Sequence, residues 1–122
     1  MRSFLFVPGD STRKFESAKK TAADALILDL EDSIAPDQKV VARGITREML
    51  DARNPEQKLY IRVNALDTDL TLGDLAAVMP GKPDGIVLPK CAGAADVNKL
   101  ALYLDAFEAA SGIAQGTTRI IT

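Results

Sequence analysis

One stretch, Ala25–Asp37 (ALILDLEDSIAPD), constrains the fold more than any other part of the chain. Five of its first six residues are apolar, and Asp29, Glu31 and Asp32 lie close together after the run. An apolar run without polar alternation is typical of a parallel strand that is covered on both faces. Pro36 stands where a helix can begin. The stretch therefore predicts a buried parallel strand that delivers acids to its carboxyl end, where α/β folds bind ligands.

Strand-like and helix-like segments alternate along the sequence, and strands start about every 20–35 residues, as in βα units. The expected strands are Ser3–Val7, Ala25–Leu30, Leu59–Val63, Gly85–Leu88 and Arg119–Ile121. The expected helices are Thr12–Ala22, Pro36–Ala52, Leu70–Met79 and Ala94–Ser111. In the second helix, Val41, Ile45 and Met49 recur every four residues, so we expect them to face the core.

Two architectures fit five strands and four helices. One is a complete flavodoxin-like sheet, and the other is the N-terminal half of a TIM-type (β/α)8 barrel, which needs about 250 residues in full. No helix follows the last strand, so one face of a flavodoxin-like sheet would stay bare. We therefore expect a half barrel of about four βα units plus the start of a fifth strand. Residues 1–122 would form one partial barrel domain, and the chain would be a fragment.

Composition and charge exclude several classes of function. The 122 residues are 47% hydrophobic and 26% charged, which is typical of one globular core. The net charge of −2 and the lack of a long basic run argue against nucleic-acid binding. No apolar run approaches the roughly 18 residues of a membrane span. The single cysteine, Cys91, favours a reducing cytoplasm, and the absence of histidine excludes a histidine base, triad or zinc ligand from this sequence.

Polar residues collect just after the predicted strands, and parallel strands would bring them to one rim. They include Asp29, Glu31, Asp32, Arg62, Asn64 and Lys90. Within the third strand, strict alternation predicts that Arg62 and Asn64 point to the same side.

The acids and Arg62 each allow two interpretations. Clustered carboxylates suit a hard cation such as Mg²⁺, directly or through its waters, but they can also cap the next helix and pair with basic residues. Arginine is rarely buried without a partner. Arg62 can therefore form a structural salt bridge to Asp29 or Glu31, or it can clamp a substrate carboxylate through two hydrogen bonds.

The other basic residues are also ambiguous. Arg13 and Lys14 lie in the first turn of the first predicted helix, where the dipole disfavours cations. They are either a solvated pair or a pair that serves a phosphate docked at that helix start. Lys90 follows a strand and can contact substrate or pair with the acids.

Four motifs, RSFLFVPGD, ADALILDLEDSIAPDQKVVAR, YIRVN and PDGIVLPK, occur in this order over nearly the whole chain. Together they resemble the citrate lyase β-subunit-like proteins of the HpcH/HpaI aldolase family. The resemblance implies an oligomeric TIM-type barrel. It also implies Mg²⁺-dependent cleavage or formation of a carbon–carbon bond in a 3-hydroxyacyl-CoA, such as citryl-, malyl- or citramalyl-CoA.

By the same resemblance, Arg62 matches the arginine that binds the substrate carboxylate. Glu31 and Asp32 match acids near the metal that hold its waters, and Arg13 and Lys14 fall in the region that meets the CoA phosphates. The direct Mg²⁺ ligands of the family, a Glu and an Asp, are expected beyond Thr122. The resemblance thus implies activity for the whole protein and not for these residues alone.

Two alternatives remain at this stage. One is an aldolase that acts on free hydroxy-keto acids without CoA. The other is a flavodoxin-like receiver domain, which places its acids after the first strand and its phosphate-accepting aspartate after the third. Here the acids follow the second strand, and Arg62 occupies the third, which argues against a receiver.

Overall fold

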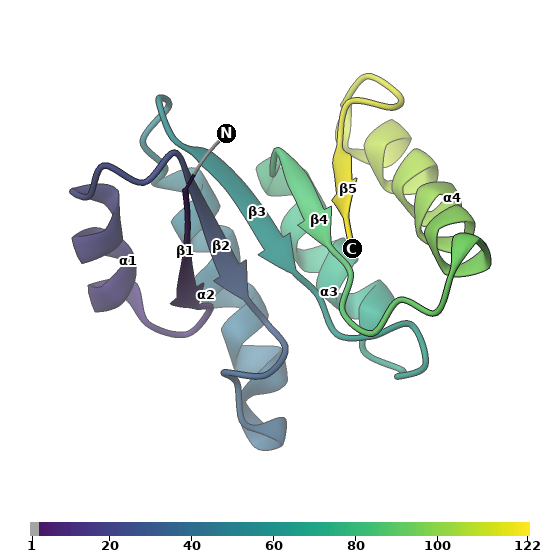
Figure 1. Ribbon diagram of the computed structural model, residues 1–122, viewed down its shortest axis with the longest axis horizontal. Helices are drawn as coiled ribbons and strands as arrows, with labels where there is room; N and C mark the ends of the chain where they lie inside the picture. The colour runs from purple at the N-terminus through teal and green to yellow at the C-terminus, as the bar shows by residue number, and fades with distance from the viewer. Residues whose placement is uncertain (1–2) are drawn as a thin grey trace.

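Five strands pair side by side in the order in which they occur in the sequence (Figure 1). The computed structural model describes residues 3–122. The strands are β1 (Phe4–Pro8), β2 (Ala25–Asp29), β3 (Lys58–Arg62), β4 (Gly85–Val87) and β5 (Arg119–Ile121), and all four pairings are parallel. A flavodoxin-like sheet has the order 2-1-3-4-5. The observed order therefore excludes that alternative and, with it, the receiver domain.

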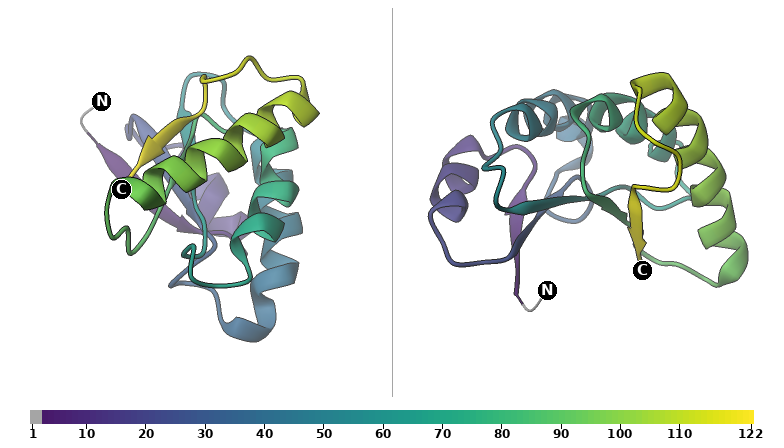
Figure 2. Two further views of the ribbon diagram at one scale, coloured as in Figure 1. Left: turned by 90° about the vertical axis from the view of Figure 1, so that its right-hand side faces the viewer. Right: turned by 90° about the horizontal axis from the view of Figure 1, so that it is seen from above.

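The helices lie together on the convex side of the curved sheet, and the concave side carries none of the described helices (Figure 2). They are α1 (Thr12–Lys19), α2 (Lys39–Asp51), α3 (Thr71–Val78) and α4 (Ala94–Ser111), with short 3₁₀ turns η1 (Pro36–Gln38) and η2 (Met79–Gly81). A parallel sheet curved in this way, with its helices outside, is the N-terminal half of a TIM-type barrel. Within residues 3–122, no helix has both the length and the apolar character needed to cross a membrane.

Of the three residues of α2 that were expected to face the core, Met49 is buried and Ile45 packs against the core, but Val41 does not. At the start of the helix the buried face is shifted by about one residue, or 100° of helix rotation. Val41 is 55% exposed, whereas Ala42 and Thr46 are fully buried. The Thr46 hydroxyl donates to the Gly9 carbonyl at 2.9 Å, and this bond turns that side of the helix toward β1. The start of the segment as a 3₁₀ turn at Pro36–Gln38 also changes the phase that a continuous helix would have.

Strand side chains divide into two layers. Those on the convex side form the core with the helices: Val7, Leu26, Leu28, Leu59, Ile61 and Ile86. The concave side carries Ala25, Ile27 and Tyr60, with Val87 and Ile121 packed against them. The Phe4 ring meets Tyr60 edge-on at 6.1 Å between centroids and remains 45% exposed. Both faces of β2 are therefore covered by other side chains, as expected, whereas one face of β1 is left exposed.

Candidate functional site

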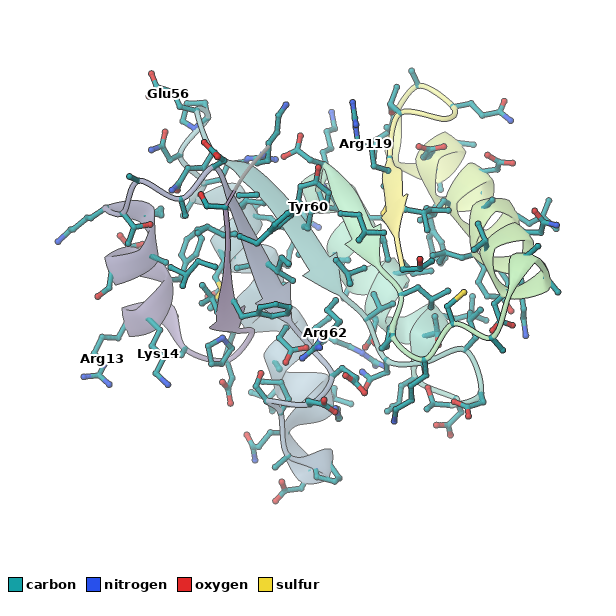
Figure 3. The ribbon with its side chains drawn as sticks, in the orientation of Figure 1. Arg13, Lys14, Glu56, Tyr60, Arg62 and Arg119 are labelled. Carbon is teal, nitrogen blue, oxygen red and sulfur yellow. The ribbon has the colours of Figure 1, made fainter. Side chains whose placement is uncertain are left out.

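Arg62 and Asp29 are the last residues of neighbouring strands, and the parallel register pairs them directly. Arg62 Nε and Nη2 donate to the two carboxylate oxygens of Asp29, each at 2.9 Å. The guanidinium also lies over the Phe6 ring, 4.8 Å from its centroid. Figure 3 shows Arg62 at the edge of the sheet where the strands end, which is the edge where barrels bind ligands. The salt bridge considered from the sequence is therefore present, and it fixes the guanidinium at the rim.

Asp29 is charged in this setting despite its burial. Burial alone would raise the pKa of its carboxyl group, but the bond from Arg62 and the backbone N–H groups of Glu31 and Ser33 outweigh it and lower the pKa to about 2. The hydrogen bond to Asp29 in turn raises the pKa of Arg62, as do the charges of Glu31 and Asp32. Arg62 and Asp29 thus form a permanent ion pair that also ties down the loop after β2.

Glu31 lies between two cations. Its side chain is 9% exposed, and its carboxylate oxygens are 3.6 Å from Arg62 Nε and 3.6 Å from Lys90 Nζ. Asp32 is exposed and lines a hollow of about 470 Å³ together with Asp29 and Arg62. The structure thus brings the predicted residues Glu31, Asp32, Arg62 and Lys90 to one part of the rim.

Lys90 reaches the rim from the loop after β4. Its backbone adopts a left-handed conformation with φ of 54°, and its side chain is 72% exposed. Lys90 and Arg62 both line an open hollow of about 720 Å³, whose walls include the apolar Val87 and Leu88. Because most of its side chain is exposed, Lys90 can exchange its contact with Glu31 for a ligand.

Arg13 and Lys14 occupy the first turn of α1, and both are exposed. Figure 3 shows them at the same edge of the sheet as Arg62 but to one side of it. Lys14 lines the hollow that contains Asp32 and Arg62. Arg13 lines a separate groove between α1 and β1. The structure therefore brings Lys14, and not Arg13, to the cavity around Arg62.

Asn64 does not point to the same side as Arg62, so the predicted alternation is wrong here, although Asn64 lines a smaller hollow at the rim with Glu31, Asp32 and Lys90. Its amide nitrogen donates to Asp74 Oδ2 at 2.8 Å and to the Leu30 carbonyl at 3.0 Å. The alternation of side chains stops because β3 ends at Arg62, two residues earlier. The buried Asp74 and its partner Arg43 were missed by the sequence reasoning. An acid within the mostly apolar helix TLGDLAAV was the signal that could have found them.

The residues at the rim fit only part of a Mg²⁺ site. Among residues 3–122, no group of three or more His, Cys, Asp or Glu side chains could hold a metal ion. The oxygens of Asp29 are already used by Arg62 and two backbone amides. Glu31, which is buried, and Asp32, which is exposed, remain, and carboxylates of this kind can hold water molecules around Mg²⁺.

A parallel half barrel with charged side chains gathered at its carboxyl rim defines the class, the (β/α)8-barrel proteins, whose active sites lie at this rim. Within that class, the chain belongs to the HpcH/HpaI aldolase/citrate lyase family, whose model matches residues 2–122.

Known proteins agree with this assignment. The chain is 42% identical over 101 residues to a (3S)-malyl-CoA thioesterase of Cereibacter sphaeroides, covering 82% of this chain and 35% of that protein. It is 37% identical over 123 residues to citrate lyase subunit beta of Escherichia coli, covering 98% and 40%. The protein CitE of Mycobacterium tuberculosis, solved with magnesium, acetoacetate and coenzyme A, matches with a TM-score of 0.70 at 39% identity, over 80% of this chain and 35% of that one. The chain thus spans less than half the length of each.

Proposed function

We propose that the complete gene product is a Mg²⁺-dependent carbon–carbon lyase that cleaves or forms a 3-hydroxyacyl-CoA such as citryl-, malyl- or citramalyl-CoA. Residues 1–122 would form part of its barrel domain and supply the pocket for the substrate carboxylate. One observation carries the proposal: a guanidinium at the carboxyl rim, fixed by Asp29 and Phe6 and placed 3.6 Å from Glu31. The names of the relatives, which include a malyl-CoA thioesterase and a citrate lyase subunit, support this class of substrate.

Arg62 would bind the carboxylate of the keto or hydroxy acid. A guanidinium has five N–H donors, and Asp29 takes one from Nε and one from Nη2. The three donors that remain on Nη1 and Nη2 can form a second two-pronged pair with a carboxylate. Because Asp29 and Phe6 already hold the guanidinium in place, substrate binding would not have to pay the entropic cost of ordering this side chain.

Glu31 and Asp32 would hold the waters of Mg²⁺ beside that carboxylate. When bound, Mg²⁺ supplies Lewis-acid polarisation of the substrate oxygen. Lys90 would contact the substrate from the opposite side of Glu31, since its exposed ammonium reaches the same hollow as Arg62. Arg13 and Lys14 would meet the CoA phosphates from the start of α1, and Lys14 is better placed because it lines the hollow next to Asp32. We further propose that the protein assembles as a homo-oligomer.

Assays of the complete gene product test the proposal. We expect cleavage of malyl-, citramalyl- or citryl-CoA that stops when EDTA removes Mg²⁺ and resumes when Mg²⁺ is restored. The comparison substrates are the same acids without CoA (malate, citramalate and citrate) and free hydroxy-keto acids. Cleavage of free hydroxy-keto acids that is indifferent to CoA would support the aldolase alternative and overturn the CoA-dependent function.

A further inference from the structure

The backbone that carries Glu31 accepts hydrogen bonds from the side chains of Lys39 and Asn64. Neither residue lines the hollows that Arg62 lines. The Leu30 carbonyl accepts one hydrogen bond from Lys39 Nζ at 3.0 Å and another from Asn64 Nδ2 at 3.0 Å. The same Lys39 ammonium also donates to the Glu31 carbonyl. Lys39 is the first residue of α2, and Asn64 follows β3. Two elements of the fold thus grip two successive peptide groups of the acidic loop.

Asn64 is itself held in one orientation by Asp74. The carboxylate oxygen Oδ2 of Asp74 accepts from both the backbone N–H and the side-chain amide of Asn64, each at 2.8 Å. The other oxygen accepts from Arg43 Nε at 2.9 Å. Because Asp74 is fully buried, it needs all of these partners to offset its desolvation. The network places the Asn64 amide so that its nitrogen, and not its oxygen, faces the Leu30 carbonyl.

The N–H groups and the carbonyl groups of the loop are therefore held by different residues. Asp29 accepts from the backbone N–H groups of Glu31 and Ser33. Lys39 and Asn64 donate to the carbonyls of Leu30 and Glu31. Glu31 then has little freedom to move from its place between Arg62 and Lys90, where each cation is 3.6 Å away. Errors of about 1 Å in the position of such groups can cost about 100-fold in rate.

We propose that Lys39 and the Asn64–Asp74 pair are positioning residues for Glu31 and Asp32. They act on the loop backbone and set where the two carboxylates can hold the waters of Mg²⁺. Lys39 and Asn64 also line a hollow of about 290 Å³ with Glu31, Asp32 and Lys90, but they donate to the loop carbonyls and to Asp74, not to the two carboxylates of the loop. This inference rests on the proposed function for the role of Mg²⁺, but the rigidity of the loop can be measured independently of activity.

The test uses the complete gene product and the variant Lys39→Met, which keeps the length of the side chain and removes its donors. We expect amide hydrogen exchange in residues 30–34 to become about tenfold faster, and calorimetric titration with Mg²⁺ alone to show about tenfold weaker binding. Lys39→Arg restores the donors, so both the exchange rate and the Mg²⁺ affinity should return most of the way to the wild-type values. Lys20→Met, at the exposed end of α1, should change neither.

A purely structural role predicts a different pattern. Leu104→Ala opens the core under α4 and should lower the melting temperature without changing Mg²⁺ affinity or exchange at residues 30–34. If Lys39→Met behaves like Leu104→Ala, the positioning role is wrong. If exchange accelerates in Lys39→Met but the wild-type protein binds no Mg²⁺ and cleaves no CoA ester, the loop is positioned as proposed and the proposed function fails instead.

Discussion

At the scale of single residues, Arg62 is the side chain on which the proposed chemistry depends most. We predict that Arg62→Ala lowers kcat/KM for the CoA ester by about 100- to 1,000-fold, the usual effect of removing one preorganised electrostatic group. Arg62→Lys should keep the charge beside Asp29 and hence the fold, but recover little activity, because an ammonium cannot bridge two carboxylates as a guanidinium does. Steady-state kinetics of both variants, with Arg47→Ala on the exposed face of α2 as the control, make the comparison. Near wild-type activity of Arg62→Ala would contradict the clamp.

The lowered pKa of Asp29 predicts how the stability of the fold changes at acidic pH. Its pKa is lowered from 3.8 to about 2 in the folded chain. A carboxyl group with a lowered folded-state pKa stabilises the fold above its unfolded pKa, and this stabilisation is lost as the pH falls from about 4 to about 2. The contribution is about 2 kcal/mol. Urea unfolding at several pH values measures the free energy of unfolding of the wild type and of Asp29→Asn. The difference between the two free energies should become smaller as the pH falls through this range. A difference that does not depend on pH would contradict the ion pair.

The residues found from the sequence share one property: they lie at the carboxyl ends of strands or in the loops just after them. Parallel pairing brings such residues together, so Glu31, Asp32, Arg62 and Lys90 could be predicted to meet. The bond from Arg62 to Asp29 was one of two alternatives, because the sequence does not show which acid has the better angle. Lys39 and Asp74 lie in helices, and their partners depend on how α2 and α3 pack, which no local pattern records.

At the scale of elements, the positions of the strands and helices were predictable, but their boundaries and faces were less so. The helix Ala94–Ser111 and the strand Arg119–Ile121 were predicted with the observed bounds. α1 ends at Lys19 and not at Ala22, because the Thr21 hydroxyl donates to the Ala18 carbonyl and ends the helix. Such side-chain bonds to the backbone compete with helix formation and are hard to foresee.

At the scale of elements, one prediction concerns the close contact between Gly9, which follows β1, and helix α2. A Cβ on Gly9 would lie 2.5 Å from Thr46 Oγ1 and 2.7 Å from the Asp29 carbonyl oxygen. The backbone oxygen cannot move without disturbing the rim, so Gly9→Ala should destabilise the chain by about 1–3 kcal/mol.

Gly44 is the matched control. It lies within α2, and an added Cβ would meet no atom within 4 Å. Gly44→Ala should therefore stabilise the chain by about 0.5–1 kcal/mol through helix propensity. Urea unfolding of both variants measures the contrast. Equal effects would show that the close approach at Gly9 does not limit the fold.

At the scale of the whole molecule, the choice of a half barrel over a flavodoxin-like sheet rested on the bare face that the latter would leave. The observed strand order and the helices on one side confirm that choice. What the sequence could not show is how open the concave side is. The apolar run of β1 is typical of a strand that is covered on both faces, yet β1 is covered on one face only.

The exposed rings of β1 predict association of the 122-residue chain in solution. Phe4 and Phe6 are 45% and 52% exposed on an edge strand, and such strands favour intermolecular pairing. Sedimentation at increasing concentration should show self-association that Phe4→Thr reduces. Leu102→Thr, which removes a side chain 68% exposed on α4, is the control and should have no effect. A strictly monomeric wild-type chain would contradict the role of this surface.

The agreement between sheet order and chain order has a consequence for synthesis on the ribosome. Each strand pairs with the one made just before it, so every new βα unit finds its docking surface already outside the exit tunnel. Among the five strands of residues 3–122, loop-closure costs stay small because no pairing waits for a distant segment. Folding can thus proceed vectorially, and the part of the rim formed by Arg62, Glu31 and Lys90 can assemble once β4 and the Lys90 loop have emerged.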